Sequence, residues 1–184
     1  IEWGADESDE MGLTQRVSKS QARALTYDKG RILYPGQWYF GFRRSLRMIR
    51  QQLSILDGVD YVSAPSDIET MFDKRLTHQK CALHNVPVPQ ALPRCGSFEE
   101  LLEEMTTHGM RRVFVKLANS SSASGVVALE INGKRIQAFS SVELQQSAGQ
   151  TAFYNSLRVR RYKCAKKIGT IVDFLSANGM HVEA

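Results

Sequence analysis

A lysine and a run of small, hydroxyl-bearing residues lie close together in the sequence, and this combination is suited to binding anions. The segment RVFVKLANSSSASGVVALEI spans residues 112–131, and seven small residues at 119–125 separate its two apolar runs. Hairpin loops usually have about two to five residues, so a longer loop calls for a reason. Main-chain amides in such a loop can point into one concavity and hold an anion, with hydroxyls as further donors. Strand periodicity places Lys116 on the same face as Phe114, from where its ammonium group would reach that anion.

The anion-binding interpretation of this segment rests on residue types, and a flexible serine-rich surface loop is the alternative. Gly125 can adopt a positive φ without steric cost. One charge pair at about 4 Å and an effective dielectric constant near 20 contributes on the order of 4 kcal/mol before desolvation. Neither a GxxxxGK[ST] nor a GxGxxG motif is present. The candidate binding residues of the segment are Lys116, Ser120, Ser121, Ser122, Ser124 and Gly125.

The elements that must position these residues are predicted from hydrophobic periodicity and turn signals. Asn132-Gly133 suits the type I′ turn of a two-residue hairpin. A helix over residues 166–177 carries Ile168, Ile171, Val172 and Leu175 on one side, and Gly179 ends it. Strands are predicted at residues 112–117, 126–131, 134–141, 153–162 and 180–184.

The preceding half of the chain is predicted to be mainly helical. Trp38, Phe42, Leu46, Ile49 and Leu53 form one face of a helix, with arginines on the remaining surface. Residues 1–30 are predicted to be loop, and 31–34 and 59–64 to be short strands. Ser66 and Ser97 each begin a capping-box pattern. The first box opens a helix that carries Ile68, Met71, Phe72 and Leu76 inward and runs to the prolines of 85–89; the second opens a helix that ends near His108. The fold class is therefore α/β (mixed α+β).

Composition limits the class of protein. Of the 184 residues 42% are apolar and 23% are charged, as in soluble globular proteins. No apolar stretch approaches the roughly 18 to 20 residues that span a bilayer, so no membrane partner is expected. Three widely spaced cysteines and four scattered histidines favour free thiols and a cytoplasmic setting over a zinc site. The net charge of +5 permits an anionic partner. The chain opens on Ile1 rather than on methionine, which suggests a fragment of a longer protein but leaves open whether the chain is a fragment or complete.

The order of these motifs resembles the ATP-grasp superfamily. Asp73-Lys74 opens a helix that runs to Asn85-Val86-Pro87-Val88-Pro89, a capped helix follows, and then a strand with Lys116 leads into the small-residue loop. The resemblance covers roughly residues 60–184. It implies the end of a small α/β pre-ATP-grasp domain at 1–64. A partial ATP-grasp nucleotide-binding domain with an antiparallel sheet and helices would follow at 65–184.

The resemblance also implies roles for single residues. Lys74 would lie near the phosphates of ATP, Lys116 would contact the α-phosphate and the adenine edge, and residues 120–125 would cover the β- and γ-phosphates. Glu183, in the strand that leads to the adenine hinge, would hydrogen-bond the base. The parent protein would be a ligase that activates an unidentified carboxylate with ATP and magnesium for attack by an amine or a thiol. The magnesium ligands would lie outside this chain, and this chain alone would be inactive.

A basic segment near the end of the chain supports a different hypothesis, a nucleic-acid-binding or non-catalytic anion-binding module. Tyr154 and Tyr162 would add stacking to phosphate contacts. In a strand, however, Arg158 and Arg160 share one face and Arg161 lies on the other, which divides the patch. A nucleic-acid partner is therefore not favoured, and the oligomeric state is left open. The basic residues are Arg158, Arg160, Arg161, Lys163, Lys166 and Lys167.

Overall fold

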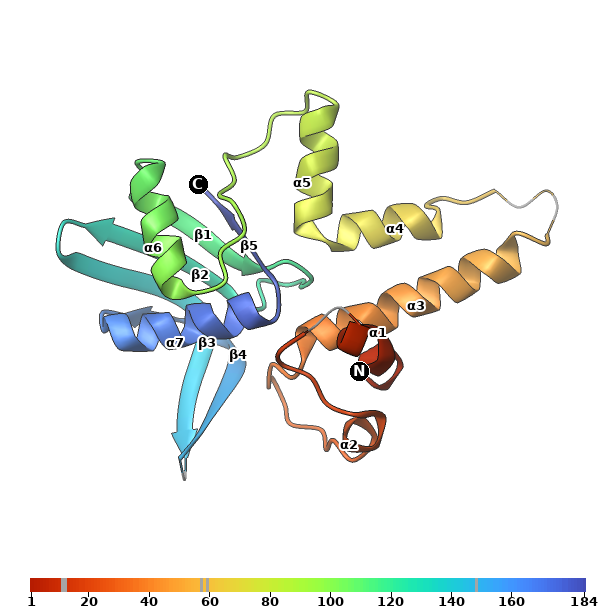
Figure 1. Cartoon of the computed structure of the whole chain (residues 1–184), viewed down its shortest axis with the longest axis horizontal. Helices are drawn as coiled ribbons and strands as arrows, with labels where there is room; N and C mark the ends of the chain where they lie inside the picture. The colour runs from red at the N-terminus through yellow and green to blue at the C-terminus, as the bar shows by residue number, and fades with distance from the viewer. Residues whose placement is uncertain (11–12, 57, 59, 148) are drawn as a thin grey trace. The chain divides into compact units, whose positions relative to one another are not determined.

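The computed structural model of the chain describes residues 1–10, 13–56, 58, 60–147 and 149–184. They form two compact units, of which the first comprises Ile1–Thr26 and Tyr34–Val88 and the second Tyr27–Leu33 and Pro89–Ala184 (Figure 1). Residues 65–88 thus belong to the first unit, whereas the sequence grouped them with the region that follows. The assignment of the chain to a pre-ATP-grasp and an ATP-grasp domain stays a prediction.

The second unit is built on a five-stranded antiparallel sheet. Its strands are β1 (Arg112–Leu117), β2 (Val126–Asn132), β3 (Arg135–Ser147), β4 (Gln150–Tyr162) and β5 (Met180–Glu183), in the order β4-β3-β2-β1-β5. The first four form a meander of hairpins, and β5 then pairs with β1. The predicted strands are confirmed, and so is the mixed α and β class.

Helices α6 (Phe98–Thr107) and α7 (Ala165–Ala177) cover one face of this sheet (Figure 1). The predicted inner face of α7 is confirmed, because Ile168, Ile171, Val172 and Leu175 are all buried. Ser97 caps α6 by accepting a hydrogen bond from the Glu100 amide, as predicted. The other half of the motif differs, since the Glu100 carboxylate accepts from the Gly96 amide.

Two local predictions in the second unit need correction. Asn132, the last residue of β2, pairs with Arg135, the first residue of β3. The turn residues are therefore Gly133 and Lys134 rather than Asn132 and Gly133. Gly133 has φ +58° and Lys134 is not among the described residues with positive φ, which is the pattern of a type II′ turn. The predicted strand at 31–34 is reduced to one isolated bridge, between Arg31 and Tyr154.

The first unit is helical. Its elements are η1 (Glu2–Gly4), α1 (Ala5–Glu10), α2 (Lys19–Arg23), α3 (Pro35–Leu53), α4 (Pro65–Phe72) and α5 (Lys74–Leu83). The predicted loop over 1–30 is therefore wrong at residues 2–10 and 19–23, whereas residues 13–18 and 24–30 contain no helix or strand. Contacts with α3 hold the N-terminal residues in place, because the fully buried Gln37 side chain bonds to Ile1 and Val17. Gly4 of η1 packs against α3 so closely that a Cβ there would lie 1.9 Å from the Gln37 backbone carbonyl oxygen.

The close approach of η1 also changes the buried face of α3. Tyr39, Phe40 and Leu46 are buried, whereas Trp38 is 40% and Ile49 is 48% exposed. The predicted apolar face is thus wrong in part. Arginines of α3 form ion pairs with acidic residues of α1 and α4, namely Arg43 with Glu69, Arg44 with Asp6, and Arg47 with Glu7.

Further predictions for this unit also differ from the structure. The strand predicted at 59–64 is absent from the described residues 60–64, and Val59 lies outside the described part. Ser66 does not cap α4, which begins at Pro65. Met71 and Leu76, predicted to face inward, are exposed. The single helix expected from 66 to 84 is divided at Asp73, which has extended φ and ψ and caps α5 through the Arg75 amide.

Candidate functional site

The candidate site lies on the sheet face opposite to α6 and α7, where β1 and β5 are neighbours. Alternate residues of β1 point into the core, which leaves Lys116 on the other face. The strand register pairs Lys116 with His181 and Phe114 with Glu183. Lys116 Nζ forms an ion pair with Glu183 Oε1 and lies 5.5 Å from the centre of the Phe114 ring. Two of the predicted site residues, Lys116 and Glu183, are therefore in direct contact.

The electrostatic surroundings keep the Glu183 carboxylate ionised. Its side chain is 16% exposed, and that of Lys116 is 24% exposed. His181 Nε2 donates to the second carboxylate oxygen at 3.0 Å. Burial alone would raise the pKa of Glu183, but hydrogen bonding and charge from Lys116, with a smaller contribution from His181, outweigh it and lower the pKa. Lys116 and Glu183 thus form an ion pair in which both side chains are partly shielded from water.

The serine-rich loop that follows β1 contains a tight turn. Ser122 and Ala123 have φ of +53° and +54°, and the Ser124 amide donates to the Ser121 carbonyl at 3.0 Å. These are the features of a type I′ turn, whose two central residues both need positive φ. Neither central residue is glycine here, and a left-handed conformation costs each of them about 1–2 kcal/mol. Other contacts must therefore hold the turn in place.

Those contacts attach the loop to the sheet. The Leu117 amide donates to the Gly125 carbonyl at 3.0 Å, and the Ser141 hydroxyl of β3 donates to the Ala123 carbonyl at 2.6 Å. The Ser120 hydroxyl donates to the Leu117 carbonyl at 3.2 Å. The loop is thus anchored at several points rather than connected only at its ends.

The loop and the lysine do not converge in this structure. The Lys116 ammonium group lies over Phe114 and pairs with Glu183, which faces Phe114 in the register, whereas the loop begins beyond Leu117. The Ser124 amide is already bonded within the turn and is not available to an anion. Ser121 and Ser122 are exposed. An anion held by the loop would have to draw Lys116 away from Glu183.

Asn119 is a residue of the loop that the sequence did not single out. It is 7% exposed, and its buried Nδ2 has no hydrogen-bond partner in the described structure. A buried amide of this kind normally has a partner. Its sequence signal is weak, since it is only the first polar residue after a buried strand end.

Lys74 belongs to the other unit and is the first residue of α5. The preceding Asp73 is buried, and its carboxylate accepts from the Arg75 backbone and guanidinium group. The position of Lys74 near the phosphates of ATP, which the resemblance implies, stays a prediction.

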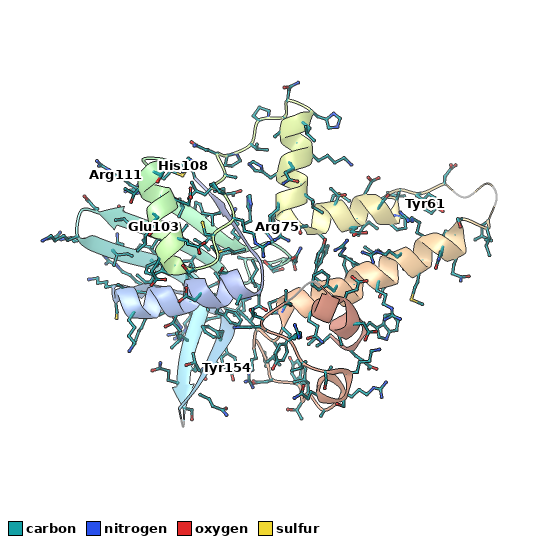
Figure 2. The ribbon with its side chains drawn as sticks, viewed as in Figure 1. Tyr61, Arg75, Glu103, His108, Arg111 and Tyr154 are labelled. Atoms are coloured by element: carbon teal, nitrogen blue, oxygen red, sulfur yellow. The ribbon has the colours of Figure 1, made fainter. Side chains whose placement is uncertain are left out.

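The basic segment of β4 is divided among different contacts. Arg160 forms an ion pair with Glu143, and Arg161 lies over the Phe139 ring. The two tyrosines proposed for stacking donate their hydroxyls within the unit, Tyr162 to the Val142 carbonyl and Tyr154, labelled in Figure 2, to Asp28. This arrangement does not present one continuous basic and aromatic surface.

Comparisons with protein-family models, with curated proteins and with solved structures find no match to this chain. Among the described residues, no three His, Cys, Asp or Glu side chains come together as ligands of a metal ion. No helix in the described ranges is both long and apolar enough to cross a membrane.

Proposed function

We propose that the second unit binds ATP on the helix-free face of its sheet, as part of an ATP-grasp-type ligase that activates a carboxylate. The observation that carries the proposal is the partly buried pair of Lys116 and Glu183. The strand that carries Lys116 leads into an anchored loop of small residues. The order of motifs that resembles the ATP-grasp superfamily supports it independently.

Binding would proceed by an exchange of partners at Lys116. Glu183 holds the ammonium group in a defined position in the absence of nucleotide, and a phosphate oxygen would replace the carboxylate. Charge-assisted hydrogen bonds of this type are stronger than neutral ones, and their strength increases as water is excluded. Glu183, released from Lys116 but still bonded to His181, would then accept a hydrogen bond from the adenine amino group.

The loop would contribute small donors and little steric hindrance. Ser121 and Ser122 expose hydroxyl groups, and the type I′ turn fixes their backbone. A preorganised loop loses little conformational entropy when a ligand binds. Asn119 would complete the set as a buried amide donor.

The reaction of the parent protein would join two substrates through an acyl phosphate. An oxygen of the carboxylate attacks the γ-phosphorus, the bond to the β,γ-bridging oxygen breaks, and ADP leaves. An amine or a thiol then attacks the acyl carbon and releases phosphate. Among the described residues no three His, Cys, Asp or Glu side chains come together. By the resemblance, the magnesium ligands would come from outside this chain, and no step is assigned to the metal here.

A cytoplasmic setting, where ATP is available, belongs to the same proposal. Cys81, Cys95 and Cys164 are all free thiols, which agrees with a reducing compartment.

Calorimetric titration of magnesium-ATP into the chain tests the proposal. Lys116→Met keeps the aliphatic part of the side chain and removes its charge, and we expect a dissociation constant at least about ten-fold higher, which corresponds to about 1.4 kcal/mol. Lys166→Met, at the exposed start of α7, is the matched control and should bind like the wild type.

Circular dichroism must show that Lys116→Met is folded, since it leaves Glu183 with one partner fewer. Equal affinities of the wild type and Lys116→Met, or no heat of binding with the folded wild type, would contradict the proposal.

A further inference from the structure

A second charged region lies at the other end of the same sheet. A cavity of about 720 Å³ opens beside the β2–β3 turn and the start of α7, and a cavity of about 400 Å³ shares Glu130 and Asn132 with it. The larger cavity is within the range of small-molecule sites, about 300–1,000 Å³. Its cationic lining residues are Lys134, Arg135, Arg161 and Lys163, and the smaller cavity adds Arg111 (labelled in Figure 2) and Arg112.

A polar network across four strands organises the floor of these cavities. Arg112 of β1 donates to Glu130 of β2 at 3.0 Å, and Gln137 of β3 donates to the other carboxylate oxygen at 2.7 Å. Arg161 of β4 donates twice to the side-chain oxygen Oε1 of Gln137, at 3.1 and 2.6 Å, and lies 5.5 Å from the centre of the Phe139 ring. Arg161 is thus fixed by contacts on two sides.

The charge of the two cavities is strongly positive. Six cationic side chains and one carboxylate line the two cavities. The excess of five positive charges equals the net charge of the whole chain. Glu130 already accepts from Arg112 and Gln137, which lower its pKa and keep it ionised. In the described part of the chain no ion pair within 4.0 Å joins Lys134, Arg135 or Lys163 to a carboxylate. The excess charge of these three residues therefore has no internal counterion there.

We propose that these cavities form an anion site, separate from the Lys116 site, for a small ligand that carries several linked phosphate groups. Converging cations in a concave site raise the local concentration of such an anion. Arg161, held by Gln137 and Phe139, offers its remaining donors in a fixed plane, as bidentate phosphate recognition requires. The two exposed lysines, Lys134 and Lys163, add mobile charges at the rim.

The shape of the site favours a small polyanion over a nucleic acid. Four of the six cations line one cavity, and the other two line the cavity that adjoins it. The hydroxyl groups of Tyr154 and Tyr162 donate to partners within the unit. The site is also distinct from the proposed nucleotide site. Arg112 and Lys116 are four residues apart in β1, which is about 13 Å along an extended strand.

Titration of the chain with inorganic tripolyphosphate, without magnesium, tests this proposal. We expect saturable binding that weakens as salt is added. The double variant Lys134→Gln, Lys163→Gln should bind about 100-fold more weakly, because removal of each charge-assisted hydrogen bond weakens binding about ten-fold. The double variant Lys166→Gln, Lys167→Gln removes the same charge from exposed residues that line neither cavity, and its affinity should fall by less than about three-fold.

Equal weakening in the two double variants would mean a diffuse charge effect and would overturn the proposal, as would the absence of binding to the wild type. A single-stranded oligonucleotide that binds more tightly than tripolyphosphate, and loses affinity in the cavity variant, would assign the region to nucleic acid instead. Failure of ATP binding at Lys116 would leave these outcomes unchanged, because no step of this inference uses that residue.

Discussion

Replacement of Gly125 by alanine tests whether the serine-rich loop is fixed to the core. Gly125 has φ +66° and is buried at the end of the loop. A Cβ there would lie 2.6 Å from Leu117 Cδ1 and 3.2 Å from Leu175 Cδ2. Both leucines are almost fully buried, at 2% and 0% exposure, so neither can move without disturbing its neighbours.

The expected cost has two parts. A left-handed conformation costs alanine about 1–2 kcal/mol relative to glycine, and the overpacked Cβ adds about 1–3 kcal/mol. In the unfolded chain alanine has less conformational freedom than glycine, and this difference stabilises the folded state of the variant by about 0.4–1 kcal/mol. We therefore expect Gly125→Ala to lower the free energy of unfolding by about 2–4 kcal/mol.

Chemical denaturation followed by circular dichroism measures this difference, with Gly109→Ala as the matched control. Gly109, after α6, has a similar φ of +64°, but a Cβ there would meet nothing within 4 Å. The control carries the conformational cost alone, about 1 kcal/mol. If both variants are destabilised equally, the loop adjusts to the added methyl group without cost, and the fixed geometry described for it is wrong.

Three further predictions follow from buried polar groups. Gln37→Leu removes the side-chain partner of the Val17 amide and of the Val17 carbonyl, whereas the Ile1 carbonyl keeps the Gly4 amide. The variant should cost about 2–6 kcal/mol in denaturation, because each of the two orphaned groups costs about 1–3 kcal/mol. The pKa of Glu183 is lowered in the folded chain, so its contribution to stability is present above the ordinary value of 4.5 and is lost as pH falls through the folded pKa. Lys116→Met should raise that pKa and so reduce the stability that is lost on acidification, as carboxyl NMR titration of Glu183 would show, and an unchanged pKa would contradict the pairing. Burial, chiefly, raises the pKa of Tyr39 to about 12, so the folded chain keeps a proton that the unfolded chain loses near pH 10. Stability should therefore decline between about pH 10 and pH 12, and the decline should be weaker in Tyr39→Phe.

The second unit could be predicted from the sequence almost completely, because its signals are local. β5 alternates apolar and polar residues, β1 and β2 are short apolar runs, α7 has a clear apolar side, and Gly133 and Gly179 mark chain reversals. What the pattern could not provide is the position of β5 beside β1. That pairing depends on how α7 crosses the sheet, and it is the reason that Glu183 meets Lys116.

The first unit was harder to predict because contacts distant in sequence decide its structure. Nothing local indicates that residues 2–10 are helical, since η1 and α1 are stabilised by packing on α3 and by pairs such as Arg47 with Glu7. The same contacts bury Gln37 and expose Trp38, which reverses the order that hydrophobicity predicts. The spacing of apolar and polar residues predicts where a helix forms, but contacts with neighbouring elements decide which of its faces is buried.

The cavities beside the β2–β3 turn were also missed by sequence reasoning. Their cations come from the start of β1, the β2–β3 turn and the end of β4, so they are scattered in the sequence and gather only when the sheet forms. The basic run at the end of β4 was noticed, but β pairing separates its members: Arg160 turns to Glu143, and Arg161 joins Gln137.

Backbone amide chemical shifts, recorded during titration with magnesium-ATP, would locate the nucleotide on the chain. We predict that the largest changes occur at Lys116, in residues 118–125 and at 181–183, and that they saturate together. Changes confined to residues 130–137 and 161–163 would place the nucleotide in the basic cavities, and an unperturbed Lys116 would contradict the proposed ATP site.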